Sequence, residues 1–111
     1  MTETVAALAW CPFPDLESAR DISGALLDER LIGCANILGE IEALFEWEGE
    51  RSRGTEVAVL FKTNGDILDR LIERLGELHP YDTPAILAWR CDAAHPSTLA
   101  WLGDLGAKEQ S

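Results

Sequence analysis

Apolar and polar positions follow two different periods along the chain, and each change of period marks a new element. Residues 5–11 form a short apolar run of the length of a strand. Apolar residues then recur every three or four positions over about residues 16–31, which predicts an amphipathic helix. The same spacing returns over residues 67–78 and predicts a second helix, before which Thr63 and Asp66 have the spacing of a capping box.

Period-two alternation predicts the remaining strands. Residues 34–47 alternate between acidic and apolar side chains, and residues 55–62 are rich in β-branched and apolar types, so the two runs form a long hairpin. The polar stretch 49–54 between them is predicted to be its turn. Residues 84–91 are expected to form a fourth strand, and a short last helix is expected over about residues 97–105.

The predicted order of strand, helix, strand, strand, helix, strand is the split βαβ arrangement. It indicates a ferredoxin-like α+β fold (βαββαβ) with an antiparallel sheet, a long hairpin and a short C-terminal helix. Right-handed crossovers place both main helices on one face of that sheet. The length of 111 residues indicates a single domain over residues 1–111, with a frayed tail at residues 107–111.

The predicted sheet is apolar on both faces, whereas the two main helices cover only one of them. Leu8 and Trp10 alternate with small apolar residues in the first strand, and Leu87 and Trp89 do so in the fourth. An apolar face of this size needs a second subunit or the last helix to cover it. Residues 34–47 would span about 46 Å when extended, so the hairpin must protrude or bend. We therefore expect a closed homo-oligomer.

The charge of the chain narrows the choice of partners. Nine basic residues against twenty acidic ones give a formal net charge of −11. Without clustered Lys and Arg, neither nucleic acid nor an anionic membrane surface is an expected partner. No apolar run reaches the roughly 20 residues of a spanning helix, and the first residues lack the pattern of a signal peptide. The three cysteines, odd in number and far apart, favour reduced thiols and a cytoplasmic location.

Five segments carry a specific combination of motifs: ERLIGCANI (29–37), FEWEGE (45–50), EVAVLFKT (56–63), HPYDTPAI (79–86) and LAWL (99–102). Together they resemble the CutA family of divalent-cation tolerance proteins, with agreement in spacing and order over nearly the whole chain. The resemblance implies a ferredoxin-like homotrimer related in architecture to the PII signalling proteins. It also implies a role in tolerance to divalent metals, with binding of copper or another divalent ion.

The resemblance further implies which residues form a site. Cys11 and Cys34 stand where family members often carry cysteines, and with His79 they are the expected metal contacts. Positions that line a cleft near the subunit boundary in the family are matched here by Trp47, Glu56, Lys62, Tyr81 and Trp101. The chain departs from the family pattern by apolar replacements at Phe45, Ala85 and Leu99. These replacements remove polar groups from or near the implied site, so an activity that depended on them would be weakened or changed.

Each candidate also has a purely structural explanation. A thiolate is a good ligand for copper(I), but buried cysteine often packs as a small hydrophobe; Cys11, beside Pro12, is expected nearer to solvent. His79 follows the second helix, where the helix dipole alone favours a cation. Cys91 matches no position of the family pattern and is expected to be structural. The row of glutamates within residues 40–50 forms either a solvated strand face or a site for hard cations.

Two hypotheses for the function follow. The first is a cytoplasmic homotrimer that binds divalent metal ions, copper first, and acts in metal homeostasis without turnover. The alternative is a PII-like regulatory trimer that holds a small anionic ligand in the inter-subunit cleft around Lys62, His79 and Trp47, since Lys62 precedes a helix start suited to anions. An enzyme is not supported, because the sequence has no nucleophile–base pair, no phosphate loop and no HExxH motif.

Overall fold

The computed structural model describes residues 4–106 of the chain. In chain order its elements are β1 (Ala6–Phe13), α1 (Leu16–Asp28), β2 (Cys34–Trp47), β3 (Glu50–Asn64), α2 (Leu68–Leu78), β4 (Leu87–Arg90) and α3 (Pro96–Gly103). The predicted sequence of strands and helices is therefore confirmed over the described part of the chain. The expected tail at residues 107–111 lies outside the described residues.

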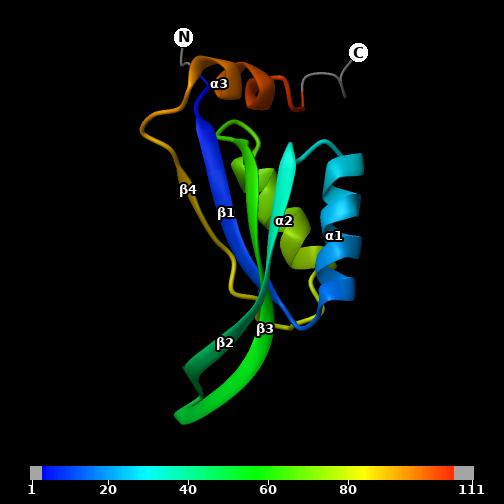
Figure 1. Cartoon of the computed structure of the whole chain (residues 1–111), viewed down its shortest axis with the longest axis vertical. Coiled ribbons are helices and arrows are strands. Elements are labelled where there is room, and N and C mark those ends of the chain that lie inside the picture. The colour runs from blue at the N-terminus through cyan, green and yellow to red at the C-terminus, as the bar shows by residue number, and fades with distance from the viewer. Residues whose placement is uncertain (1–3, 107–111) are drawn as a thin grey trace.

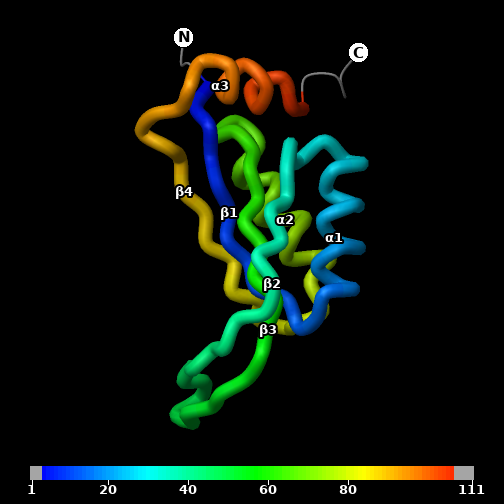
Figure 2. The backbone as a smooth tube through the Cα atoms, viewed as in Figure 1, coloured from blue at the N-terminus to red at the C-terminus, as the bar shows by residue number. Residues whose placement is uncertain are grey.

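The four strands form one sheet in the order β2-β3-β1-β4, and every pair of neighbours is antiparallel. Both main helices lie on the same side of this sheet, as the right-handed crossovers require, and α3 crosses one end of it (Figure 1). The tube view follows the path of the chain from β1 through α1 to the long hairpin and back (Figure 2). The predicted α+β ferredoxin-like fold is confirmed.

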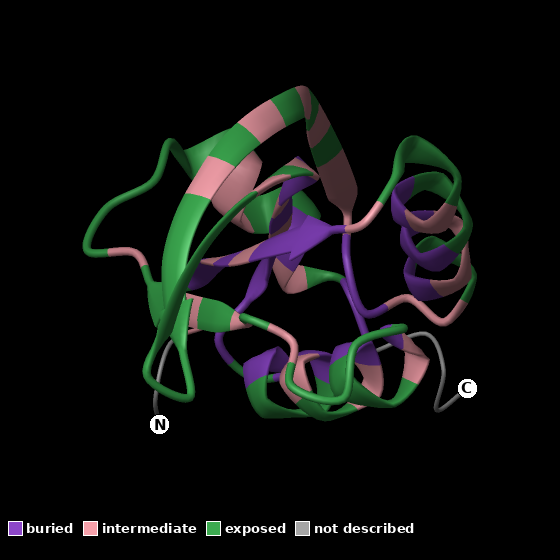
Figure 3. Cartoon of the chain, turned by 90° about the horizontal axis from the view of Figure 1, so that it is seen from below, coloured by how far each residue is buried: buried purple, intermediate pink, exposed green. Residues whose placement is uncertain are grey.

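The main core lies between the helices and one face of the sheet, as the view from below shows (Figure 3). Its sheet residues are odd-numbered in both central strands and pair across them, for example Ala9 with Phe61. They are Ala7, Ala9, Cys11, Phe13, Val57, Val59 and Phe61. Because successive side chains of a strand point to opposite faces, the even-numbered residues of these strands face the side that neither main helix covers. We call that side the open face.

The hairpin of β2 and β3 extends beyond the rest of the molecule and sets its longest dimension of 47 Å. The two strands pair as far as Trp47 opposite Glu50, so the turn consists of Glu48 and Gly49. Both turn residues have positive φ, 52° and 82°, as a two-residue hairpin turn requires. The predicted turn at residues 49–54 is wrong, because residues 50–54 are the first part of β3, which is polar on both faces but paired with β2.

A bulge interrupts the pairing of β2 with β3 where the hairpin leaves the body. The register shifts between Ile37 and Gly39, which leaves Leu38 as the extra residue. Gly39 has φ +93°, a conformation that side chains rarely adopt. Bulges increase local twist and bend a strand, and the hairpin that contains this one curves away from the sheet (Figure 1).

The ends of the helices differ from the sequence prediction for local reasons. Helix α1 ends at Asp28, not near residue 31, because Arg30 adopts a left-handed φ of 58°. The capping box before α2 is wrong: the Thr63 hydroxyl donates to the Leu31 carbonyl at 2.8 Å. The side-chain oxygen of Asn64 instead accepts the N–H groups of residues 66 and 67, so this amide caps the turn that leads into α2.

Two strands also differ in length from their predictions. Strand β1 continues through Pro12 to Phe13, which extends its pairing with β3, whereas residue 11 was the predicted end. Strand β4 is limited to Leu87–Arg90, because β1 pairs with it over four residues only. The last helix begins at Pro96, with the ring of His95 accepting the N–H of Ser97.

We predict that Gly39→Ala lowers the free energy of unfolding by about 1–2 kcal/mol, because an L-residue at this φ is strained. No atom lies within 4 Å of a Cβ added at Gly39, so the cost is conformational and not steric. Gly54→Ala is the matched control, because Gly54 is also in the hairpin and has open space but no positive φ. Urea denaturation of both variants measures the difference. Equal effects at the two positions would contradict the conformational role of Gly39.

Candidate functional site

Cys11 lies in the main core on the face of the sheet that the helices cover. Its side chain is 0% exposed, and it pairs with Val59 between β1 and β3. Burial, with the Glu56 carboxylate as a second cause, raises the pKa of the Cys11 thiol to about 12. The expectation that Cys11 lies nearer to solvent is wrong, because β1 does not end there but continues through Phe13.

Cys34 begins β2 on the open face, directly opposite Lys62 of β3. Its thiol is half-buried and lies 3.6 Å from the side-chain oxygen of Asn36. Cys11 and Cys34 therefore lie on opposite faces of the sheet, because Cys11 shares its face with Val59 and Cys34 shares its face with Lys62. Two strand spacings and an offset of three residues separate them by about 14 Å along the sheet. One chain does not bring these two thiols together.

His79 follows α2 and is buried against β1. Its Nε2 lies 2.9 Å from the Pro12 carbonyl, and its Nδ1 accepts the Tyr81 N–H at 3.1 Å. Since a carbonyl only accepts and an N–H only donates, these partners assign the donor role to Nε2 and the acceptor role to Nδ1. The ring also stacks on Phe13, with 4.8 Å between centroids. Both nitrogens are thus engaged within the chain.

Tyr81 joins His79 to the base of the hairpin. Its hydroxyl donates to the Glu56 carboxylate at 3.0 Å, and its ring lies 4.8 Å from that of His79. Burial, followed by the hydrogen bond to Glu56, raises the pKa of Tyr81 to about 12. Two of the five predicted cleft residues, Glu56 and Tyr81, are therefore in contact, and the third member of this group is the predicted metal contact His79.

The other predicted cleft residues lie elsewhere. Lys62 stands near the start of β2, where its carbonyl accepts the Gly33 N–H at 2.8 Å. Trp101 of α3 covers Gly33 so closely that an added Cβ would lie 3.1 Å from the indole ring. Trp47 is next to the hairpin turn. Within one chain, the cleft set is therefore divided among the hairpin base, the α3 end of the sheet and the hairpin tip.

The candidate metal and cleft residues do not all come together within residues 4–106 of one chain. Over residues 4–106, no group of three or more His, Cys, Asp or Glu side chains is placed to hold a metal ion. The set Cys11, Cys34 and His79 is divided between the two faces of the sheet, and the set Lys62, His79 and Trp47 between its two ends and the hairpin tip.

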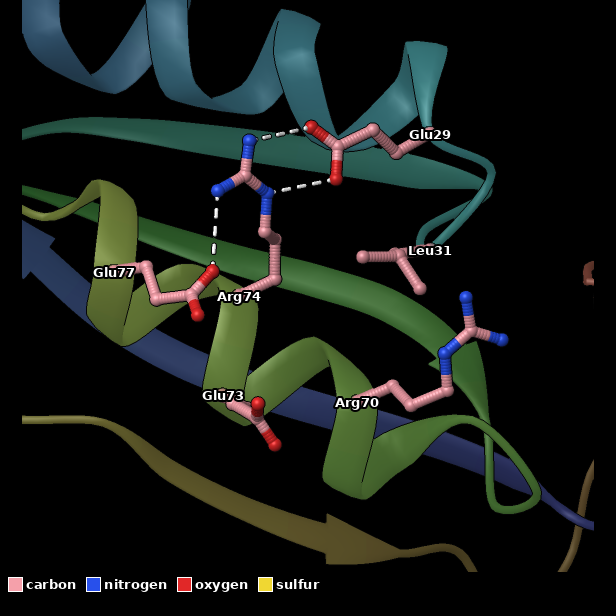
Figure 4. A pocket seen from close by; sticks show the side chains of 6 residues that line it. All are labelled: Glu29, Leu31, Arg70, Glu73, Arg74 and Glu77. Carbon is pink, nitrogen blue, oxygen red and sulfur yellow. Dashed lines mark hydrogen bonds and ion pairs between the residues drawn. The ribbon is translucent and has the colours of Figure 1, made fainter.

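A hollow of about 200 Å³ lies between the end of α1 and the outer side of α2, and Arg74 is paired with Glu29 across it (Figure 4). Arg74 donates two hydrogen bonds to Glu29, at 2.8 and 3.0 Å, and one to Glu77 at 3.1 Å. The bonds from Arg74 lower the pKa of Glu29. This half-exposed network ties α1 to α2 and offers no cluster of free carboxylates.

Sequence reasoning missed a second hollow at the base of the hairpin. It has a volume of about 280 Å³ and is lined by Pro14, Asp15, Leu16, Gly39, Glu40, Thr55 and Val57. Asp15 is committed to the start of α1, where its carboxylate accepts the Ser18 N–H at 2.7 Å. The sequence signal for this feature was Gly39, the glycine before Glu40, which marks the bulge and lines the hollow.

The structure is thus that of an α+β protein with one four-stranded sheet, one face of which neither main helix covers. The half-buried thiol of Cys34 lies on this open face. The model of the CutA1 divalent ion tolerance protein family matches residues 7–104. The chain therefore belongs to this family. Over residues 4–106, no helix is long and apolar enough to cross a membrane.

Individual relatives agree with this assignment. The chain is 44% identical over 95 residues to the divalent-cation tolerance protein CutA of Pyrococcus horikoshii, covering 86% of this chain and 92% of that protein. The CutA protein of Thermotoga maritima is 38% identical over 95 residues, with 86% and 93% covered. The crystal structure of CutA1 from Ehrlichia chaffeensis superposes with a TM-score of 0.86 at 34% identity, over 93% of this chain and 96% of that one.

We predict that the thiol of Cys11 reacts with iodoacetamide at least about tenfold more slowly than those of Cys34 and Cys91, because burial excludes the reagent and disfavours the thiolate. All three cysteines are free, and only Cys11 among them is fully buried. Peptide mass spectrometry of the native, reduced protein follows the three sites in one sample. Labelling of Cys11 as fast as Cys91 would contradict the placement of Cys11 in the core.

Proposed function

We propose that this protein is a homotrimer that binds divalent metal ions, copper first, and acts in metal tolerance without turnover. Membership of the CutA1 divalent ion tolerance family supports the role in tolerance. The observation that supports assembly into an oligomer is the exposure of large apolar side chains on the open face. Leu87 is 66% exposed there and Trp89 is 47% exposed. Apolar side chains this large and contiguous are characteristic of an interface between subunits.

The apolar surface continues from the sheet onto the hairpin. The register places Leu8 beside Trp89 and Trp10 beside Leu87 on the open face. Beyond the bulge, the β2 residues paired with Glu56, Gly54, Ser52 and Glu50 continue the same face along the hairpin; they are Ile41, Ala43, Phe45 and Trp47. A surface that spans both the body and the hairpin suits a partner that lies along the full length of the chain. A further copy of the chain is such a partner.

The metal contact that we propose is Cys34. It is a half-buried thiol on the open face, so an assembly through that face can supply it with ligands from another copy. Thiolates suit copper(I), which makes copper the first ion to test. Cys11 and His79 fit this role less well within the chain, since the Cys11 thiol is buried and both nitrogens of His79 are hydrogen-bonded. Free thiols also support a reducing, cytoplasmic location.

Trp89→Glu is expected to convert the trimer to monomers, because it places a charge in a desolvated apolar interface. We expect association to weaken by at least about a hundredfold. Leu27→Glu is the matched control: Leu27 is as exposed as Trp89, at 45% against 47%, but lies on α1, away from the open face. Native mass spectrometry gives the number of chains. A wild-type monomer, or a Trp89→Glu trimer, would contradict the proposed assembly.

Titration of the reduced protein with copper(I) tests the contact separately from the assembly. We expect whole-number uptake by the wild type, loss of uptake in Cys34→Ser, and retention in Cys91→Ser, because a hydroxyl is a poor ligand for a soft ion. Native mass spectrometry reports both the copper content and the oligomeric state. Uptake by Cys34→Ser equal to that of the wild type would exclude Cys34 as the contact, and a bare wild-type trimer would contradict copper binding.

A further inference from the structure

Asn64 and Gly65 form a sequence pair that is chemically labile, and this pair is buried under α3. In an Asn-Gly pair the backbone nitrogen of glycine can attack the asparagine side chain, since glycine has no Cβ to hinder the approach. The chain contains one other asparagine, Asn36, which is followed by the β-branched Ile37. Asn64 is only 1% exposed, whereas Asn36 is exposed.

Every polar atom of this pair that would take part in such a reaction is hydrogen-bonded. The Asn64 Oδ1 accepts the N–H groups of Asp66 at 2.9 Å and Ile67 at 3.2 Å, and Nδ2 donates to the Leu102 carbonyl at 2.7 Å. These partners fix which atom is oxygen and which is nitrogen, because N–H groups need an acceptor and a carbonyl needs a donor. The Gly65 N–H donates to the Val5 carbonyl at 2.8 Å.

Helix α3 holds the amide nitrogen, and α3 is attached separately from the main core. Leu102 packs in a small second core, whose buried members are Ala6, Ile67, Leu102 and Leu105. A hydrogen bond from Arg30 to the carbonyl of Asp104, at 3.1 Å, fastens the end of the helix. A short helix on a small core opens locally at a lower free energy than the whole fold. Opening frees the Asn64 amide from its partner on α3.

We propose that Asn64–Gly65 is a deamidation site whose reaction is gated by the docking of α3. When α3 is released and the Gly65 N–H leaves the Val5 carbonyl, the Gly65 nitrogen attacks Cγ of Asn64 and forms the new C–N bond of a cyclic imide. The Cγ–Nδ2 bond breaks, and Nδ2 leaves as ammonia with the proton that the Gly65 nitrogen gives up. Solvent water then opens the imide at either carbonyl and leaves aspartate or isoaspartate at position 64. No oxidant or reductant takes part.

The product disfavours the docked position of α3. Aspartate presents a carboxylate oxygen where the amide donated a hydrogen bond, so two acceptors face each other at the buried Leu102 carbonyl. Because ammonia is lost, the change does not reverse. Trp101 and Leu102 pack on Gly33, so release of α3 uncovers the end of the sheet that begins with Cys34. Deamidation of Asn64, which accumulates with time, thus weakens the docking of α3 on the sheet.

The rate of reaction at Asn64 tests the gate. Wild type, Leu102→Ala and Leu71→Ala are incubated in mildly alkaline buffer at physiological temperature, and peptide mass spectrometry follows Asn64 with Asn36 as the internal reference. We expect Asn64 to react about tenfold faster or more in Leu102→Ala, because this substitution removes the Leu102 side chain from the second core and leaves a cavity there. Leu71→Ala is the matched control, because Leu71 is 0% exposed in the main core and its loss destabilises the fold without loosening α3 specifically.

Two results would contradict the proposal that docking of α3 controls deamidation of Asn64. One is a wild type that reacts at Asn64 as fast as Leu102→Ala. The other is equal acceleration by Leu71→Ala and Leu102→Ala, which would place the reaction in the globally unfolded chain. If Leu102→Ala does not fold, Arg30→Gly replaces it, since glycine keeps the left-handed φ at this position and removes the hydrogen bond and the ion pair that Arg30 makes with Asp104 at the end of α3. Its Asn64 must then react faster than that of the wild type.

The effect of the product is measured with Asn64→Asp. Hydrogen exchange of the backbone amides of α3 is expected to be at least about tenfold faster than in the wild type, with exchange in α1 unchanged. Equal exchange of α3 in the two proteins would overturn the coupling of deamidation to release of the helix.

Discussion

The pleat of β3 is the constraint on which the rest of the molecule depends. As the strand between β1 and β2, β3 fixes the register of both, and its alternate side chains are committed to opposite faces. Val59 faces the helices, and so does Cys11, which pairs with Val59. Lys62 lies on the open face, and so does Cys34, which pairs with Lys62. A shift of one residue in either pairing would exchange buried and exposed side chains along the whole strand. The main core prevents such a shift, because only one register buries its apolar residues.

This alternation explains why the chemistry-bearing residues do not meet within one chain. A sheet with helices on one face divides its side chains into a dry set and an accessible set. Cys11 belongs to the dry set, where its thiol is a packing group, and Cys34 belongs to the accessible set. His79 and Tyr81 lie at a third place, past the end of α2, and satisfy each other and the backbone. A site that used all of these residues would need more than one chain.

The sequence pattern was sufficient for the order of elements because helix and strand periods are set by local geometry. The burial of Cys11 could not be predicted from the sequence, because Pro12 suggested that the strand ends there. In the structure Pro12 is part of β1, and the carbonyl of Pro12 is hydrogen-bonded to His79. The hairpin turn was placed too late for a related reason. Beyond the body both faces of the strands meet solvent, so the polar residues after Gly49 belong to a strand and not to a turn. Pairing with β3, which is distant in sequence, decided the first case, and the two-residue turn at Glu48 and Gly49 decided the second.

Asn64 shows how much of a fold can rest on one side chain that no periodic pattern reveals. Its oxygen satisfies two N–H groups at the entry to α2, and its nitrogen satisfies a carbonyl of α3. A carboxylate at this position could not do both, because it accepts hydrogen bonds but has no proton to donate. An alcohol could not do both either, because its single oxygen cannot lie at both places, whereas the amide has an acceptor and a donor on separate atoms. Asn64 thus joins the start of α2 to α3, and the amide that makes this link is also prone to deamidation because Gly65 follows it. The stability of the joint therefore depends on keeping Asn64 away from water, and α3 provides that cover.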